Sequence, residues 1–173
     1  MPDPSAESCG DVTPYLLVPN VSAGVIVSAM PRNLFDQRLI AALGYAGALP
    51  MLGCVLTIES SLSLMLLKSY SLAIIAFLAG NWWSTALMWR RASVRELQQI
   101  LLLSNAMVIA AVVAVTFMGS LVLLVLALLF ACLLLGERLL KVFRQQPGYY
   151  RDMRMGVTAL VVALHISAFW MLV

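Results

Sequence analysis

Charged residues are scarce in this sequence. Only 11% of its 173 residues are Asp, Glu, Lys or Arg, whereas 62% are hydrophobic. A typical soluble domain carries about 25% charged residues. A water-soluble fold of this length could not bury so much apolar surface, so the composition predicts one integral membrane domain. The net charge of +3 is small and most basic residues flank hydrophobic segments, so no nucleic-acid partner is expected.

Histidine and cysteine, two residue types that bind metals, are also few. His165 is the single histidine, and the three cysteines show no Cys-x-x-Cys or Cys/His spacing. A zinc site needs three or four ligands, so neither a metal nor another cofactor is expected. Cys54 and Cys132 lie in apolar segments and are interpreted as small buried thiols. The sequence contains no motif for a nucleophile elbow, a zinc protease, a P-loop or a dinucleotide site, so no catalytic residue is assigned.

Residues 1–37 differ from the rest of the chain. They contain five prolines and several acids, and the apolar run at 21–30 is short and follows an acidic start. A secretory signal needs a basic start before its apolar core. The composition therefore predicts a poorly ordered tail, followed by a membrane domain at 38–173. Met30 directly precedes the membrane-like sequence, so a natural start at Met30 is an alternative.

What the sequence does contain is apolar segments suited to crossing a bilayer, which takes about 20 helical residues. Five are predicted, at about residues 39–58, 70–89, 97–116, 120–135 and 155–172. Pro50 interrupts the first and should kink it, leaving a carbonyl that needs another partner. The segment at 59–68 either lies at the interface or continues the second helix. The fold class is therefore all-α, with five transmembrane helices.

Local signals define some helix ends. Ser93-Val-Arg-Glu96 has the pattern of a capping box, which opens the third span. An uncharged turn at 117–119 joins the third and fourth spans as an antiparallel hairpin. The fourth span is nearly all Leu, Val and Ala, so we expect much of it to face lipid.

Basic residues are distributed unevenly between the two sides of a five-span arrangement. The N-terminal segment, the second-to-third loop and the fourth-to-fifth loop contain ten of the eleven Lys and Arg residues, and only Lys68 falls on the opposite side. Because cytoplasmic loops are enriched in Lys and Arg, the N-terminus is predicted to lie in the cytoplasm and the C-terminus outside.

Small residues predict where helices approach closely. In the first span these are Gly44 and Gly47, near Pro50, and in the second span Ala76, Gly80 and Ser84 recur every four residues. Such faces allow close contact between membrane helices. We expect the second of these faces to pack within the chain, with a dimer contact as the alternative.

Polar residues inside the spans are the candidates for a functional site. They are Asn81 and Ser84 in the second span, and Thr158 and His165 in the fifth, where a spacing of seven places both on one face. One interpretation is a polar site that includes Trp82 and Trp83. The other is that these residues only pack and form interhelical hydrogen bonds.

The loop before the fifth span is basic. Its residues Arg138, Lys141 and Arg144 fall on one face if the fourth helix continues past Gly136, and Arg151 and Arg154 follow. These five are candidates for contact with anionic lipids, each worth about 1 kcal/mol near an anionic leaflet. The alternative is that they only anchor the topology. Glu137 and Asp152 are the acids of this loop.

Three stretches carry a family resemblance: Leu43–Pro50 (LGYAGALP), Tyr70–Ser84 (YSLAIIAFLAGNWWS), and Tyr149–Arg154 (YYRDMR) with Thr158 after it. Together they resemble the bacterial domain of unknown function 3429 family, whose eukaryotic relatives include the mitochondrial transmembrane protein sixty-nine. The resemblance covers about residues 39–172. It implies a small multi-pass protein of the bacterial inner membrane and no established reaction, cofactor or substrate. The family often has a histidine where this chain has Asn81, so a role of that histidine is not carried over.

Three classes of function follow, in order of preference. The first is a structural or assembly protein that is not an enzyme and packs against other membrane proteins or against itself. The second is a small oligomeric transporter or channel with a polar site near Asn81, Thr158 and His165. The third is a lipid-active enzyme that uses the basic loop. Membrane lipid is a partner in all three.

Overall fold

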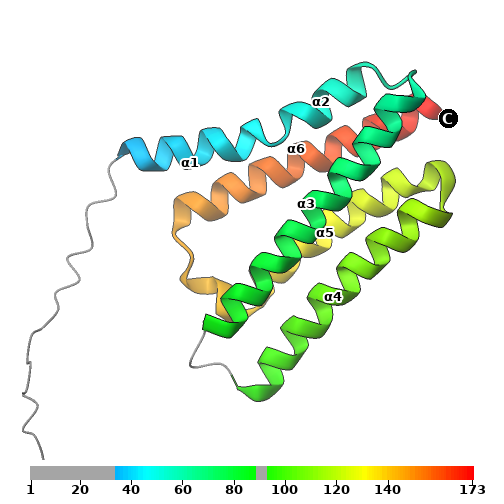
Figure 1. Ribbon diagram of the computed structural model, residues 1–173. Coiled ribbons are helices and arrows are strands. Elements are labelled where there is room, and N and C mark those ends of the chain that lie inside the picture. The colour runs from blue at the N-terminus through cyan, green and yellow to red at the C-terminus, as the bar shows by residue number, and fades with distance from the viewer. Residues whose placement is uncertain (1–33, 89–92) are drawn as a thin grey trace, which may run out of the picture. The chain divides into compact units, whose positions relative to one another are not determined.

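The computed structural model describes residues 34–88 and 93–173, and every regular element within these ranges is helical (Figure 1). The elements are α1 (Leu34–Ala46), α2 (Leu49–Leu56), α3 (Ser61–Met88), α4 (Val94–Phe117), the short 3-10 helix η1 (Gly119–Leu121), α5 (Val122–Leu139), the 3-10 helix η2 (Lys141–Gln145) and α6 (Gly148–Leu172). Five helices are long and apolar enough to cross a membrane, with α1 and α2 counted as one. The predicted fold class is confirmed. The predicted tail, apart from its last residues at the start of α1, lies outside the described residues, as does the alternative start at Met30.

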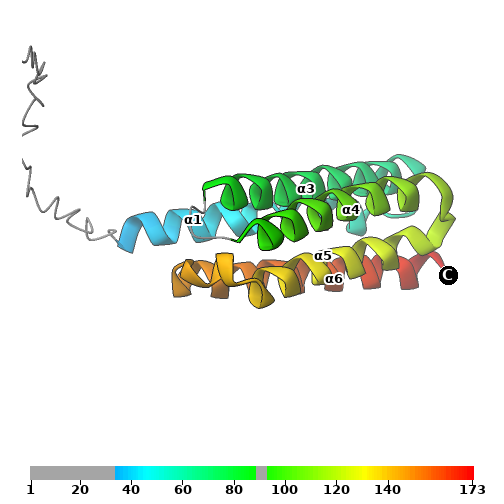
Figure 2. The same ribbon diagram turned by 90° about the horizontal axis from the view of Figure 1, so that it is seen from below.

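The long helices form two layers (Figure 2). One contains α3 and α4 and the other contains α5 and α6, while α1 packs against α6 and α2 contacts both α3 and α6. Helix α5 is the most enclosed of the five candidate spans, because α3, α4 and α6 all pack on it. The expectation that much of this helix faces lipid therefore applies to only one side of it. The other side of the helix, including Leu126, Phe130 and Leu133, fills the core, whereas Leu128 and Leu135 are exposed.

The first span breaks where Pro50 was expected to disturb it. Helix α1 ends at Ala46, and Pro50 lies in the first turn of α2, where the missing N–H has no helical acceptor to lose. The Tyr70 hydroxyl of α3 donates to the Gly47 carbonyl at 2.9 Å. A neighbouring helix thus supplies the partner that a carbonyl at such a break requires.

The ends of the helices agree with some local signals and differ from others. The Ser93 side chain accepts from the Glu96 backbone N–H and the Glu96 carboxylate accepts from the Ser93 backbone N–H, so the capping box is confirmed. The turn after Phe117 uses Gly119 at φ 53°, a conformation that favours glycine. Helix α3 begins at Ser61, so most of the segment at 59–68 continues the second span. Helix α6 begins at Gly148, several residues before the predicted start.

One end of the bundle collects most of the described basic residues. At this end α1 begins, α3 and α5 end, and α4 and α6 begin (Figure 1). The opposite end holds the α2–α3 connection, the α4–α5 turn and the C-terminus, and Lys68 lies toward it, donating to the Gly119 carbonyl at 3.4 Å. The described basic residues are thus divided between the two ends as the sequence predicted.

Gly136 is the glycine whose lack of a side chain matters most for the core. A Cβ at this position would overlap the Trp82 ring, whereas a Cβ at Gly80 would have no other atom within 4 Å. We expect Gly136→Ala to lower the free energy of unfolding by about 1–3 kcal/mol, the usual cost of overpacking. Gly80→Ala should be neutral or stabilising, because alanine has the higher helix propensity. Equilibrium unfolding in mixed micelles measures the free energy of unfolding of both variants. If Gly136→Ala were as stable as Gly80→Ala, the close packing of Trp82 against Gly136 would be contradicted.

Candidate functional site

A buried ion pair joins α5 to α6. Arg154 donates to Glu137 through two hydrogen bonds, Nε to Oε2 at 3.2 Å and Nη2 to Oε1 at 2.8 Å. The Trp82 indole N–H of α3 donates to the same Oε1 at 3.3 Å. Glu137 is 7% exposed and Arg154 9% exposed. Two parallel N–H···O bonds are the strongest arrangement of a guanidinium and a carboxylate, and they neutralise both charges inside the bundle.

The sequence places these three groups through regular helical spacing. On α5, Glu137 continues the buried face of Phe130 and Leu133. Gly136 precedes it and leaves room for the Trp82 ring, which also contacts Phe143 of η2 at a centroid distance of 5.4 Å. Arg154 lies four residues before Thr158 on the buried face of α6. Three helices and one loop therefore enclose the pair.

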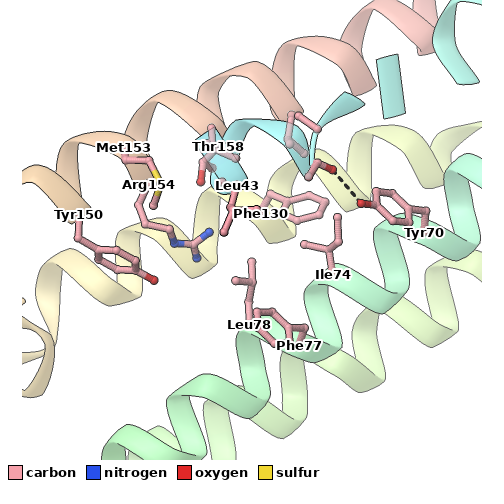
Figure 3. Close-up of a pocket in the computed structure, with 15 residues that line it drawn as sticks. Leu43, Tyr70, Ile74, Phe77, Leu78, Phe130, Tyr150, Met153, Arg154 and Thr158 are labelled. Carbon is pink, nitrogen blue, oxygen red and sulfur yellow. Dashed lines mark hydrogen bonds between the residues drawn. The ribbon is translucent and has the colours of Figure 1, made fainter. Parts of the chain in front are cut away.

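A cavity of about 270 Å³ lies beside this ion pair (Figure 3). Its walls come from α1, the α1–α2 junction, α3, α5 and α6, and most of them are apolar. Figure 3 shows Tyr150, Arg154 and Thr158 projecting from α6 into the same space, with Ile74 and Leu78 of α3 opposite. The remaining lining residues are Leu43, Gly44, Gly47, Ala48, Tyr70, Phe77, Phe130, Met153, Val157 and Val161.

Three hydrogen-bond donors of α6 that line the cavity have no acceptor among the described residues. Arg154 uses Nε and Nη2 on Glu137, which leaves Nη1 unbonded. The hydroxyls of Thr158 and Tyr150 form no hydrogen bond within the described ranges, although Thr158 is only 5% exposed. No fully enclosed side-chain nitrogen or oxygen of the described residues lacks a partner, so these unbonded donors remain reachable from the cavity. The cavity therefore offers donors to a molecule that carries acceptors.

His165 lies deeper on the same helix face and is fully buried. Its Nδ1 is 2.8 Å from the Val161 carbonyl, and its Nε2 is 2.9 Å from the Ser71 hydroxyl, which is also 2.7 Å from the Leu67 carbonyl. Because a carbonyl only accepts, Nδ1 carries a proton and donates to it. His165 thus makes the interhelical contact to a serine that was one of the two interpretations, and both ring nitrogens are occupied.

The four residues of the predicted polar site do not come together in one place. Thr158 lines the cavity, but Asn81, Ser84 and His165 do not. The Ser84 hydroxyl is exposed and donates to the Asn81 carbonyl within α3. Of the two neighbouring tryptophans, Trp82 is buried in the ion-pair cluster, whereas Trp83 is 40% exposed.

The small residues that were predicted to pack between helices also divide into two groups. Gly44 lies against Met153 of α6 so closely that a Cβ would overlap its sulfur, and a Cβ at Gly47 would be 3.3 Å from the Gly44 carbonyl oxygen. By contrast, Ala76, Gly80 and Ser84 are exposed. Among the described residues no other helix comes within 4 Å of a Cβ built at Gly80, so the expected intrachain contact is not formed at this position.

The basic residues of the α5–α6 loop do not form one helix face. Helix α5 ends at Leu139 and the extended Leu140 redirects the chain, so Lys141 and Arg144 sit on η2. Arg138 donates to the Arg151 carbonyl at 3.2 Å. The side chains of Arg138, Lys141, Arg144 and Arg151 are exposed, whereas Arg154 is buried. Arg154 therefore does not belong with the surface cations among which the sequence interpretation placed it.

Sequence reasoning missed the Glu137–Arg154 pair because it treated both residues as part of a solvated loop. A signal was present in the helical spacing. Residues 150, 154 and 158 are spaced four apart, so they extend the face that contains Thr158 and His165. Extending that face backward would have indicated a buried arginine, which requires a carboxylate partner.

Removing one member of the ion pair should destabilise the protein strongly. We expect Arg154→Met to cost about 3–5 kcal/mol of unfolding free energy, because Glu137 would remain buried without a counter-charge. The double variant Glu137→Leu/Arg154→Met should recover much of that loss, since no charge stays buried. Unfolding in mixed micelles tests both, and additive costs in the double variant would contradict direct pairing.

Comparison with known proteins gives one match. No curated protein and no solved structure matches the chain. The sequence model of the family described as "Protein of unknown function (DUF3429)" matches residues 37–170, which include all the residues of the ion pair and the cavity. Because the match extends over most of the sequence, the chain belongs to the DUF3429 family.

Proposed function

We propose that this protein is a multi-pass protein of the bacterial inner membrane that binds one amphiphilic membrane molecule, such as a lipid, in the cavity beside Arg154. The observation that carries the proposal is the set of unbonded donors in an otherwise apolar cavity. Ligand sites typically combine apolar walls with a few placed polar groups. No reaction is part of the proposal.

The position of the cavity favours entry from the side of the bundle. Among its lining residues, Leu43 of α1 is 64% exposed and Phe77 of α3 is 75% exposed. Both belong to candidate membrane spans, so in a bilayer their exposed sides would contact acyl chains. A molecule already dissolved in the membrane could therefore enter between α1 and α3.

The size of the cavity favours partial insertion of the ligand. At about 270 Å³ it is slightly smaller than the smallest usual ligand pockets, which begin at about 300 Å³. A lipid would place its polar linkage and part of one chain inside, and the rest of the chain would extend into the bilayer.

The charge distribution supports a cytoplasmic N-terminus and an outside C-terminus. Arg95, Arg138, Lys141 and Arg144 lie at the same end as the start of α6, and cytoplasmic segments are rich in such residues. Arg154 is six residues from the start of α6, or about 9 Å along the helix. The cavity would thus open to the inner leaflet of the membrane, near the depth at which the polar linkages of the lipids lie.

Filling the cavity should abolish retention of the ligand. We expect Ile74→Trp to place a large ring in the space opposite Arg154, so that lipid co-purifying with the wild type is lost. Lipids extracted from protein in polymer-bounded discs, exchanged into detergent and quantified by mass spectrometry, measure the change.

The matched control is Ile109→Trp, which introduces the same ring at an exposed position of α4 and should retain lipid as the wild type does. Equal lipid retention by Ile74→Trp and the wild type, with both folded, would contradict the proposal.

A second candidate function is assembly with another membrane protein or with itself. It is favoured by the exposure of Ala76, Gly80 and Ser84 on α3. This face permits close helix contact, and at Gly80 it has no neighbour among the residues that the structure describes.

Gly80→Leu should break such an assembly without harming the fold, because no atom of another described element lies within 4 Å of the added Cβ. Affinity purification after gentle solubilisation compares it with the wild type. Loss of a defined complex from Gly80→Leu alone supports assembly, and a wild type that runs as a monomer contradicts it.

A further inference from the structure

The charge balance of the cavity indicates which kind of head group it selects. We infer that the site recognises a neutral carbonyl group, as found in an acyl ester or a quinone, and that it discriminates against carboxylate and phosphate anions. This inference rests on the proposed function, and it adds the ligand class.

The first step is the charge of Arg154. Its guanidinium already makes two hydrogen bonds to Glu137, so the pair as a whole is neutral. An anion in the cavity would add one uncompensated negative charge to a poorly solvated site, which is strongly unfavourable. The guanidinium of Arg154, which alone would attract an anion, is thus already paired.

The second step is the kind of hydrogen-bonding group that remains. Nη1 of Arg154 can only donate, and the hydroxyls of Thr158 and Tyr150 have protons to donate. Glu137 does not line the cavity, and the Gly47 carbonyl at its other end accepts from Tyr70 (Figure 3). A carbonyl oxygen accepts hydrogen bonds and has no proton that needs an acceptor, so it matches these donors without adding charge.

The third step is the placement of the donors. Tyr150, Arg154 and Thr158 are spaced four residues apart on α6, so they form one row along the cavity wall. Figure 3 shows Ile74, Leu78 and Phe130 around the same space, where they would contact the apolar part of the ligand. The row of donors and the apolar wall together fit a carbonyl attached to a hydrocarbon.

Binding of four amphiphiles to the full chain in detergent tests the inference. The probes are monooleoylglycerol, decylubiquinone, oleate at pH 9 and oleyl alcohol, with dissociation constants from microscale thermophoresis. We expect at least one carbonyl probe to bind about tenfold more tightly than oleyl alcohol, whose hydroxyl proton needs an acceptor, and than oleate, whose charge would be uncompensated. The carbonyl probe that binds more tightly, monooleoylglycerol or decylubiquinone, shows whether the site prefers an ester or a quinone.

Two variants make the test specific. Glu137→Gln removes the counter-charge of Arg154, so its preference should reverse and oleate should bind more tightly than the carbonyl probes. Thr158→Val keeps the side-chain shape and should weaken carbonyl binding several-fold, while Thr116→Val on the exposed face of α4 should have no effect. If Glu137→Gln does not fold, the comparison of Thr158→Val with Thr116→Val still tests the inference.

The outcomes separate this inference from the proposed function. If oleate binds the wild type as tightly as the carbonyl probes do, and Ile74→Trp blocks the binding of both kinds of probe, the cavity binds amphiphiles but the selectivity for carbonyls is wrong. Unchanged carbonyl binding in Thr158→Val overturns the inference, and so does an unchanged preference in a folded Glu137→Gln. If no probe binds and Ile74→Trp retains lipid as the wild type does, the proposed function and the inference both fail.

Discussion

The bidentate contact between Glu137 and Arg154 constrains how α3, α5 and α6 pack. Removing a carboxylate and a guanidinium from water costs several kcal/mol for each ion, and only close pairing with good geometry offsets that cost. Arg154 meets both carboxylate oxygens and Trp82 adds a third donor, so the carboxylate is well satisfied. A shift of either helix along its axis would break these contacts. The leucine-rich surface of α5, which would tolerate many registers, thereby acquires a unique one.

Several neighbouring features follow from this contact. Trp82 reaches the carboxylate only because Gly136 has no side chain, and Phe143 then packs on the Trp82 ring. Helix α5 ends at Leu139 and helix α6 begins at Gly148, and this connection allows Arg154 to face Glu137. Met153, adjacent to Arg154, meets Gly44 of α1, and Tyr45 of α1 meets Gly156. The ion pair, the loop and the packing of α1 are therefore parts of one arrangement around the cavity.

Much of this fold could be predicted from the sequence, because the bilayer leaves few alternatives for long apolar segments. The number of spans, the capping box at Ser93, the break near Pro50 and the turn after Phe117 all depend on local chemistry. Helix lengths were less predictable. Residues 148–154 contain three charges, yet they join α6 because Arg154 is paired within the bundle. Which face of α3 is covered was not predictable either, since Ala76 and Gly80 allow close packing without supplying a partner.

The candidate site was harder to predict because its chemistry depends on two residues that the sequence separates by seventeen positions. The sequence indicated His165 as a candidate because it is a polar group inside a span, yet both of its ring nitrogens already have partners within the bundle, Ser71 and Val161. The sequence pattern assigned Arg154 to a basic loop, yet this residue is buried beside a cavity. What distinguishes the two is not polarity but whether hydrogen bonds remain to be made. A satisfied buried histidine stabilises the contact between α3 and α6, whereas an arginine with its charge balanced and one nitrogen unbonded can still bind a neutral acceptor.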